Sequence, residues 1–340
     1  MNESNRYSPV GSLILAAVSM IWGFSFAVQK TASRALPPFS VNTVRFFIGA
    51  LTLLLFSFFR NLIRRRRDPA YRPAPVTRTD LVAGGISGVL LFVASTLQQF
   101  SLDEGDAGIC AAITTLYIVF VPLFGAILFR KRIGVFVIVA GVVALAGTFS
   151  LSALGEAPGA DGARSLSALI SLAKSTELSI GRPALFALLC SVGFAFQILS
   201  IDRFAREVDG IRLATMEFLI SGILGVPFLL FRERPTLSAM LIALPPLLYL
   251  GILSCGVAYT LQIVGQAKTP PSVAAVLMSL EAVFGALGGI LLFGALGGIL
   301  FLGERMNAPE ILGCALILAA VFTVELSALG RGNRRGIKDP

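Results

Sequence analysis

The sequence of 340 residues contains no histidine, one tryptophan and four cysteines, and only 14% of its residues are charged. Without histidine, the chain cannot build a histidine proton relay or a histidine metal site. The cysteines stand singly in apolar segments, without the spacing of metal ligands. The chain also lacks the glycine-rich phosphate loop of nucleotide-driven pumps. We therefore expect no catalytic residues, no metal and no cofactor, and a function without covalent chemistry.

Apolar residues make up 56% of the chain, and its mean hydropathy is +0.84, far above that of soluble domains. A helix needs about 20 apolar residues to cross a bilayer, whereas a membrane strand needs about 10 in strict alternation. The sequence predicts an all-α integral membrane protein with ten transmembrane helices. These are expected near residues 11–31, 40–59, 81–101, 107–129, 133–151, 183–201, 211–231, 241–263, 272–303 and 308–328.

The basic residues are divided unevenly between the two sides that these spans define. One side holds 19 Lys and Arg and the other holds 8, with Arg45 inside a span. The richer side is expected to be cytoplasmic. This places both termini in the cytoplasm and the chain in the plasma (inner) membrane. We interpret RNLIRRRR at 60–67 as an anchor on anionic lipid. A nucleic-acid patch is the alternative, and we expect no nucleic-acid partner.

The two halves of the chain resemble each other. The 32 residues from Thr96 match those from Thr260 without a gap, at a constant offset of 164. Each half holds five predicted helices, an odd number, so the second half must enter the membrane from the opposite side. Chance similarity of apolar helices is the alternative. We predict two inverted five-helix repeats at 11–151 and 183–328, a connecting loop at 152–182 and a basic cytoplasmic tail at 329–340.

Several motifs resemble those of EamA-type transporters of the drug/metabolite transporter superfamily. They are IWGFSFAVQK at 21–30, RFFIGALTLLL at 45–55, LYIVFVPLFGAILFRKR at 116–132, MSLEAVFGALGGI at 278–290 and LGER at 302–305. The resemblance implies a ten-helix secondary transporter that exports a small organic metabolite, such as an amino acid or a drug-like compound. A membrane receptor or scaffold without transport activity remains an alternative, as does a membrane-embedded enzyme.

Polar groups inside the spans are the candidate site residues, because each is costly in hydrocarbon unless it is paired or faces a cavity. Glu281 lies near the middle of the ninth span and could contact a substrate ammonium group or carry a coupled proton. A structural hydrogen bond is the alternative. Its repeat partner is Tyr117, with Thr114 on the same helical face. Ser279 lies two residues before Glu281, on roughly the opposite face.

Four further residues complete the set of candidates. Gln98 and Gln262 are repeat partners near the ends of the third and eighth spans, suited either to a substrate site or to interhelical hydrogen bonds. Arg45 is expected to snorkel at the outer mouth or to act as a gate. It is not expected to pair with Glu217, its counterpart in the other half, because the two would lie on opposite sides of the membrane. Trp22 could pack in the core or line a cavity.

One phrase, FGALGGIL, occurs twice in the ninth span, at 284–291 and 293–300. The repeat match breaks off within it and resumes at 301 after nine residues are skipped. We interpret these nine residues as an insertion downstream of Glu281. Since nine residues rotate a helix by about two and a half turns, a straight continuation would present the wrong face. We expect Glu281 to keep its normal register and the glycine pairs at 288–289 and 297–298 to absorb the excess.

Overall fold

The computed structural model describes residues 8–105, 107–130, 133–153, 181–285 and 308–333. Within these ranges all regular elements are helices. Six helical stretches are long and apolar enough to cross a membrane, and four shorter apolar helices accompany them. This is an all-helical membrane protein. Residues 286–307, which hold most of the duplicated phrase, lie outside the described residues, as do 154–180 of the predicted loop and 334–340 of the tail.

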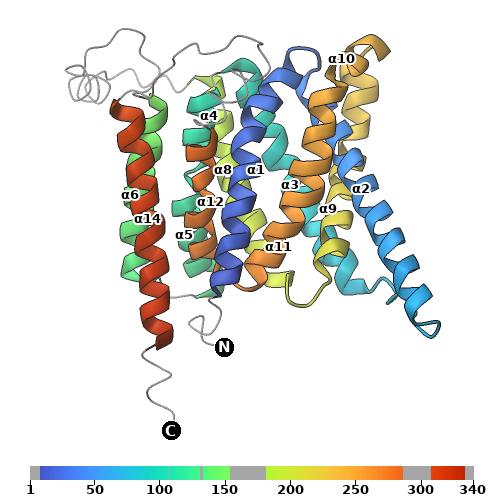
Figure 1. Cartoon of the computed structure of the whole chain (residues 1–340). Coiled ribbons are helices and arrows are strands. Elements are labelled where there is room, and N and C mark those ends of the chain that lie inside the picture. Colours follow the sequence, from blue (N-terminus) through green and yellow to red (C-terminus); the bar gives the residue numbers. More distant parts are fainter. Residues whose placement is uncertain (1–7, 106, 131–132, 154–180, 286–307, 334–340) are drawn as a thin grey trace, which may run out of the picture.

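The first half of the chain supplies six labelled helices (Figure 1). They are α1 (Pro9–Ser33), α2 (Pro38–Arg67), α3 (Arg78–Glu104), α4 (Ala107–Thr114), α5 (Tyr117–Phe129) and α6 (Val135–Ala153). Proline occupies the first turn of α1 and α2, where its missing N–H has no helical partner to lose. Helix α2 is longer than predicted, because it runs on through the basic anchor to Arg67.

The second half contains two stretches of π-helix. Its elements are α8 (Arg182–Phe204), α9 (Gly210–Pro227), η2 (Phe228–Glu233), α10 (Leu237–Leu248), η3 (Tyr249–Tyr259), α11 (Thr260–Ala267), α12 (Pro271–Met278) and α14 (Ala308–Asn333). Elements α10, η3 and α11 form one continuous helical stretch, 237–267. The π-helix η3 follows Pro245 and Pro246, which cannot donate backbone hydrogen bonds.

The described chain begins and ends at the same end of the bundle, which we call the terminal end; the opposite end is the distal end (Figure 1). Lys30, near the end of α1, donates to the carbonyls of Leu102 and Gly105 at the end of α3, both at the distal end. Arg182, at the start of α8, pairs with Glu104 there as well. Helix α8 therefore runs opposite to α1.

Helix α2 also runs opposite to the continuous stretch formed by α9 and η2, and the two are linked at both ends. At the distal end, the Glu233 carboxylate accepts hydrogen bonds from the backbone N–H groups of Phe39 and Ser40. Near the terminal end, the Arg60 Nη1 lies 3.9 Å from the Oδ2 of Asp209, the residue that caps α9. These links fix the two helices against each other.

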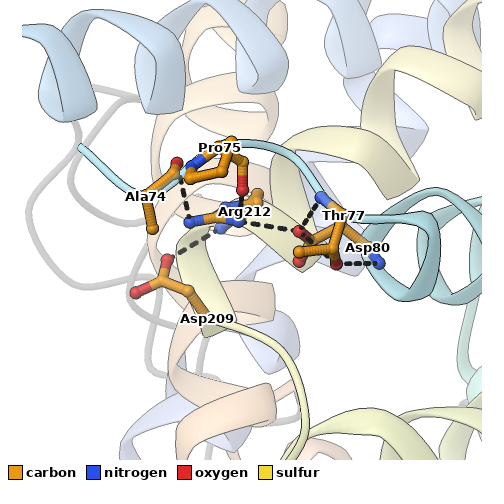
Figure 2. Close-up of polar contacts among 6 residues, drawn as sticks. All are labelled: Ala74, Pro75, Thr77, Asp80, Asp209 and Arg212. Carbon is orange, nitrogen blue, oxygen red and sulfur yellow. Dashed lines mark hydrogen bonds and ion pairs between the residues drawn. The ribbon is translucent and has the colours of Figure 1, made fainter.

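Arg212 forms a polar clamp at the terminal end, between α9 and α3 (Figure 2). Its guanidinium donates to the Asp80 carboxylate at 2.7 Å and to the carbonyls of Ala74 and Pro75. Asp80 also completes a capping box with Thr77 at the start of α3. The clamp consists of Arg212, Asp80 and these carbonyls, and it joins the two halves of the chain beside the N-termini of two helices.

Small residues let the helices of the two halves approach closely. A Cβ atom at Gly84 of α3 would overlap Met216 of α9. At Gly193 of α8, a Cβ atom would lie 2.9 Å from the Ala94 Cβ. Such close approach increases van der Waals contact. This contact drives helix association in a membrane, because lipid chains are as apolar as the side chains and leave no hydrophobic driving force. The contacts between halves therefore depend on backbone proximity.

Gly84 and its neighbour Gly85 provide a matched pair of variants. We expect Gly84→Ala to destabilise the protein by about 1 to 3 kcal/mol, because the methyl group is forced into a packed interface. Gly85 has nothing within 4 Å of its would-be Cβ, so Gly85→Ala should be neutral or stabilising by up to about 1 kcal/mol. Thermal unfolding in detergent would measure both. Equal effects of the two substitutions would contradict the close packing of α3 on α9.

Candidate functional site: a cavity between the halves

A cavity with a volume of about 40 Å³ lies between the two halves. Its walls come from α1, α2, α3, α4 and α5 of the first half and from α8, η3, α11, α12 and residue 281 of the second. The lining is both polar and aromatic: it includes one arginine, one glutamate, four glutamines, two tyrosines and the tryptophan. This combination suits a small polar molecule with an apolar part.

Glu281 and Tyr117 contact each other in this cavity. The Tyr117 hydroxyl donates to the Glu281 Oε1 at 2.9 Å, and the two side chains are only 4% and 5% exposed. The two residues are 164 positions apart, which is the offset of the internal match. In a structure with two related halves, equivalent residues meet only near the axis that relates them. The contact therefore lies near the axis that relates the two halves.

The helices that carry this pair are interrupted at equivalent positions. Helix α4 ends before Thr115 and α5 begins at Tyr117, while α12 ends before Ser279 and the helix resumes at 280. At both breaks the backbone makes a tighter bond, from Ile118 to Thr115 and from Ala282 to Ser279, each at 3.0 Å. Broken helices at mid-depth are a feature of transporter substrate sites. The breaks place Tyr117 and Glu281 in the first turn of a new helical segment.

Ser279 is the one predicted candidate that does not line the cavity. Its hydroxyl donates to the Val276 carbonyl at 2.6 Å, and the equivalent Thr115 hydroxyl donates to the Ala111 carbonyl at 2.7 Å. Hydroxyl groups that bond back to their own helix tend to bend it. Ser279 is thus part of the helix break, equivalent to Thr115. Thr114 does line the cavity, at 3.3 Å from the Cys190 sulfur.

Arg45 is buried, contrary to the expectation that it would snorkel. Helix α2 begins at Pro38, two turns earlier, so the Arg45 side chain lies within the bundle with 4% exposure. Its Nη1 donates to the Gln29 Oε1 at 2.7 Å, and its Nε has no partner among the described residues. The expectation that Arg45 would not pair with Glu217 holds, although the adjacent Phe46 and Phe218 stack with ring centroids 6.0 Å apart and so bring α2 and α9 together at this depth. Within the described chain, no ion pair joins Arg45 to Glu217.

Four glutamines contribute side-chain amides to the cavity. Gln98 and Gln262 were candidates from the sequence, whereas Gln29 and Gln197 were not. Gln29 accepts from Arg45, and Gln197 donates to the buried Glu217 carboxylate at 2.9 Å. In each half, a glutamine of the first helix therefore holds the charged residue of the second helix. The sequence signal that could have identified Gln29 and Gln197 is a single amide side chain within an apolar span.

Trp22 lines the cavity, and its ring lies against Tyr259 with centroids 4.8 Å apart and planes at 59°. The indole Nε1 has no hydrogen-bond partner in the described part of the chain. Buried tryptophan N–H groups usually have one. The cavity therefore offers an unused donor beside two aromatic rings, a suitable surface for a ligand with both polar and apolar parts.

The model of the EamA-like transporter family matches the chain twice, over residues 9–153 and 181–326. The chain belongs to the EamA-like transporter family. Members of this family are transporters, not enzymes. The two matches correspond to duplicated halves, and the cavity lies where these halves meet.

Two individual proteins are similar along most of the chain. An uncharacterized transporter from Archaeoglobus fulgidus is 28% identical over 312 residues, covering 92% of this chain and 84% of the relative. A protein of known crystal structure superposes with a TM-score of 0.66 at 20% identity, covering 94% of this chain and 99% of that one. The second likeness concerns the fold alone. Both are consistent with a family fold that extends over nearly the whole chain.

In this EamA-like transporter, every sequence candidate except Ser279 lies around one cavity: Trp22, Arg45, Gln98, Thr114, Tyr117, Gln262 and Glu281. Tyr259 lines the cavity, whereas Gln99 donates to the Ser33 hydroxyl away from it. The described residues contain no cluster of three or more Cys, Asp and Glu that could hold a metal ion. The lining offers hydrogen bonds and charge complementarity to a bound molecule.

Proposed function

We propose that the chain is a secondary carrier that exports a small zwitterionic metabolite, resembling an amino acid, across the plasma membrane. The observation that carries this proposal is the pair of buried charged groups in one cavity, Arg45 and Glu281. Each is held by a neutral partner, Gln29 or Tyr117. Buried charges normally have counterions, because desolvation is costly. A ligand with a carboxylate and an ammonium group would supply both.

Alternating access is the proposed transport mechanism, based on two inverted five-helix repeats and ten spans. The opposite directions of α1 and α8, and of α2 and α9, support the inversion. So does the occurrence of helix breaks 164 residues apart. In such folds one repeat rocks against the other around a fixed site at mid-depth. Export is the direction implied by the family resemblance of the motifs in the sequence.

The proposed orientation places both termini in the cytoplasm. Arg60 and the arginines at the end of α2 lie toward the terminal end of the bundle, where α2 projects past its neighbours (Figure 1). This position suits contact with the anionic lipid of an inner leaflet. Glu281 is the group that we propose carries a coupled proton, since a carboxyl group can bind a proton and a substrate ammonium in turn.

Three molecules of similar shape test the proposal in proteoliposomes. Phenylalanine carries both charges, phenethylamine lacks the carboxylate and 3-phenylpropanoate lacks the ammonium group. We expect phenylalanine uptake to exceed that of the other two by at least about tenfold, since each missing ionic contact removes about 1.5 to 3 kcal/mol. Protein-free liposomes correct for passive entry. Transport of phenethylamine at the rate of phenylalanine would overturn the zwitterion proposal.

The Arg212 clamp is expected to help close the terminal end during transport. Replacing Arg212 with alanine removes the ion pair to Asp80, a contact of about 1.5 to 3 kcal/mol. The reporter is Ser25→Cys, in the cavity of a chain whose native cysteines have been replaced. In inside-out vesicles, where maleimide reaches the terminal end, we expect this cysteine to react about tenfold faster in Arg212→Ala than in the chain that keeps Arg212. The matched control is Arg203→Ala, which breaks an exposed pair with Glu207. Unchanged labelling in Arg212→Ala would show that the clamp does not close this end.

A further inference from the structure

Glu217 is a second buried carboxyl group, set behind the cavity wall. It lies on α9, is fully buried and does not line the cavity. Its Oε1 accepts a hydrogen bond from Gln197 Nε2 at 2.9 Å, and its Oε2 has no partner among the described residues. A buried carboxyl group with a free oxygen is costly, so packing alone does not account for it.

Two amides connect Glu217 to the cavity. Gln262 Nε2 lies 3.5 Å from Gln197 Oε1, at the outer limit of a hydrogen bond, and both glutamines line the cavity. The Gln262 Oε1 is buried without a partner in the described part of the chain. The chain of contacts therefore runs from Glu217 through Gln197 to Gln262, with an unused acceptor at each end. We call these three residues the amide relay.

The direction of this relay depends on whether Glu217 carries a proton. A carboxylate only accepts hydrogen bonds, so Gln197 must turn its NH₂ group toward it and its carbonyl toward Gln262. Gln262 then donates to Gln197 and presents its carbonyl to the cavity. A protonated carboxyl group can donate instead. Each amide group can then rotate by about 180°, because its oxygen and its NH₂ group have nearly the same shape. After this rotation Gln262 presents its NH₂ group to the cavity.

We propose that Glu217 is a positioning residue whose protonation reverses the amide relay and so switches the hydrogen-bonding character of the substrate site. With Glu217 ionised, the cavity gains an acceptor that favours an ammonium group. With Glu217 protonated, it gains a donor that favours a carboxylate. This inference rests on the proposed transport function and adds to it a proton-dependent control of how the substrate is held.

The groups around Glu217 are suited to this role. From η3, Tyr259 and Cys255 lie near it, and Arg45 of α2 lies near the same two side chains. From α8 the Gln197 amide contacts it directly, and Gln262 of α11 lies beyond that amide. Helix α3 approaches with the backbone of Gly88, where a Cβ atom would lie 2.9 Å from the Glu217 carbonyl. No ion pair to Glu217 occurs among the described residues, so the proton has no competing counterion on the carboxyl group.

The first test uses the purified protein without any substrate. Difference infrared spectra on acidification should show a protonated-carboxyl band, together with changes in glutamine side-chain bands that have the same midpoint. Both should disappear in Glu217→Gln and persist in Glu281→Gln. A carboxyl band assigned to Glu217 that titrates without any glutamine change would overturn the relay. This measurement is independent of transport, so failure of the proposed function leaves its outcome readable.

The second test measures binding of 3-phenylpropanoate in a Glu281→Gln background, which removes the carboxyl group that lines the cavity. We expect affinity to rise about tenfold as the pH falls through the midpoint found by infrared, because the relay then offers a donor to the carboxylate. Adding Glu217→Gln should abolish this dependence. Adding Gln266→Met, one turn beyond Gln262 on α11, should preserve it. A pH dependence that survives Glu217→Gln would overturn the proposal.

Discussion

Replacing Glu281 with glutamine is expected to abolish transport of the zwitterionic substrate and leave the protein folded. The amide has nearly the same shape and can still accept from the Tyr117 hydroxyl, so the packing at the centre of the bundle survives. It carries neither a negative charge nor a transferable proton. We expect phenylalanine uptake to fall by about 100-fold, corresponding to the loss of about 3 kcal/mol from a charge-assisted contact. Initial rates in proteoliposomes would measure it.

Two further variants sharpen this test. Tyr117→Phe keeps the ring but removes the only hydrogen bond found for the Glu281 side chain in the described residues, so we expect a smaller loss of about tenfold. Glu207→Gln alters an exposed carboxylate near the end of α8 and should transport normally. A monodisperse elution profile and an unchanged melting temperature would establish folding. Unchanged uptake with unchanged pH dependence in Glu281→Gln would assign Glu281 a purely structural role.

The internal match in the sequence contained more structural information than helix number. It made Tyr117 and Glu281 repeat partners, and the structure brings the two into contact. It also related Thr115 to Ser279, and both lie at helix breaks. Repeat partners occupy equivalent places around an axis, but sequence alone does not specify how far from the axis they lie. The contact itself therefore required the three-dimensional arrangement.

Other features of the site depend on details that the sequence pattern does not contain. Gln29 and Gln197 align with apolar residues of the opposite half, so the repeat gave them no emphasis, although each holds a charged neighbour. Arg45 was placed at the membrane surface because the predicted span began close to it. Its actual depth depends on the start of α2 and on an acceptor from α1, which is a tertiary contact. Ser279 was assigned to the site by proximity to Glu281, whereas its hydroxyl bonds its own helix.

Replacing Arg45 with methionine is expected to change which molecules the carrier accepts. Methionine fills a similar length of the cavity wall but removes the guanidinium, the cation that would meet a substrate carboxylate. We expect the KM for phenylalanine to rise by about 10- to 100-fold, equivalent to about 1.5 to 3 kcal/mol. Phenethylamine, which has no carboxylate, should be affected by less than about threefold. The ratio of the two uptake rates is therefore the quantity to measure.

Two variants separate the charge of Arg45 from its geometry. Arg45→Lys keeps the cation but loses the planar fork that binds Gln29 and a carboxylate together, so it should recover only part of the affinity. Arg206→Met removes an exposed arginine and should leave both substrates unaffected. If Arg45→Met impaired phenylalanine and phenethylamine equally, the guanidinium would be supporting the fold through Gln29 and not recognising a carboxylate. The zwitterion assignment would then lose one of its two charged contacts, and Glu281 alone would favour an amine as the transported molecule.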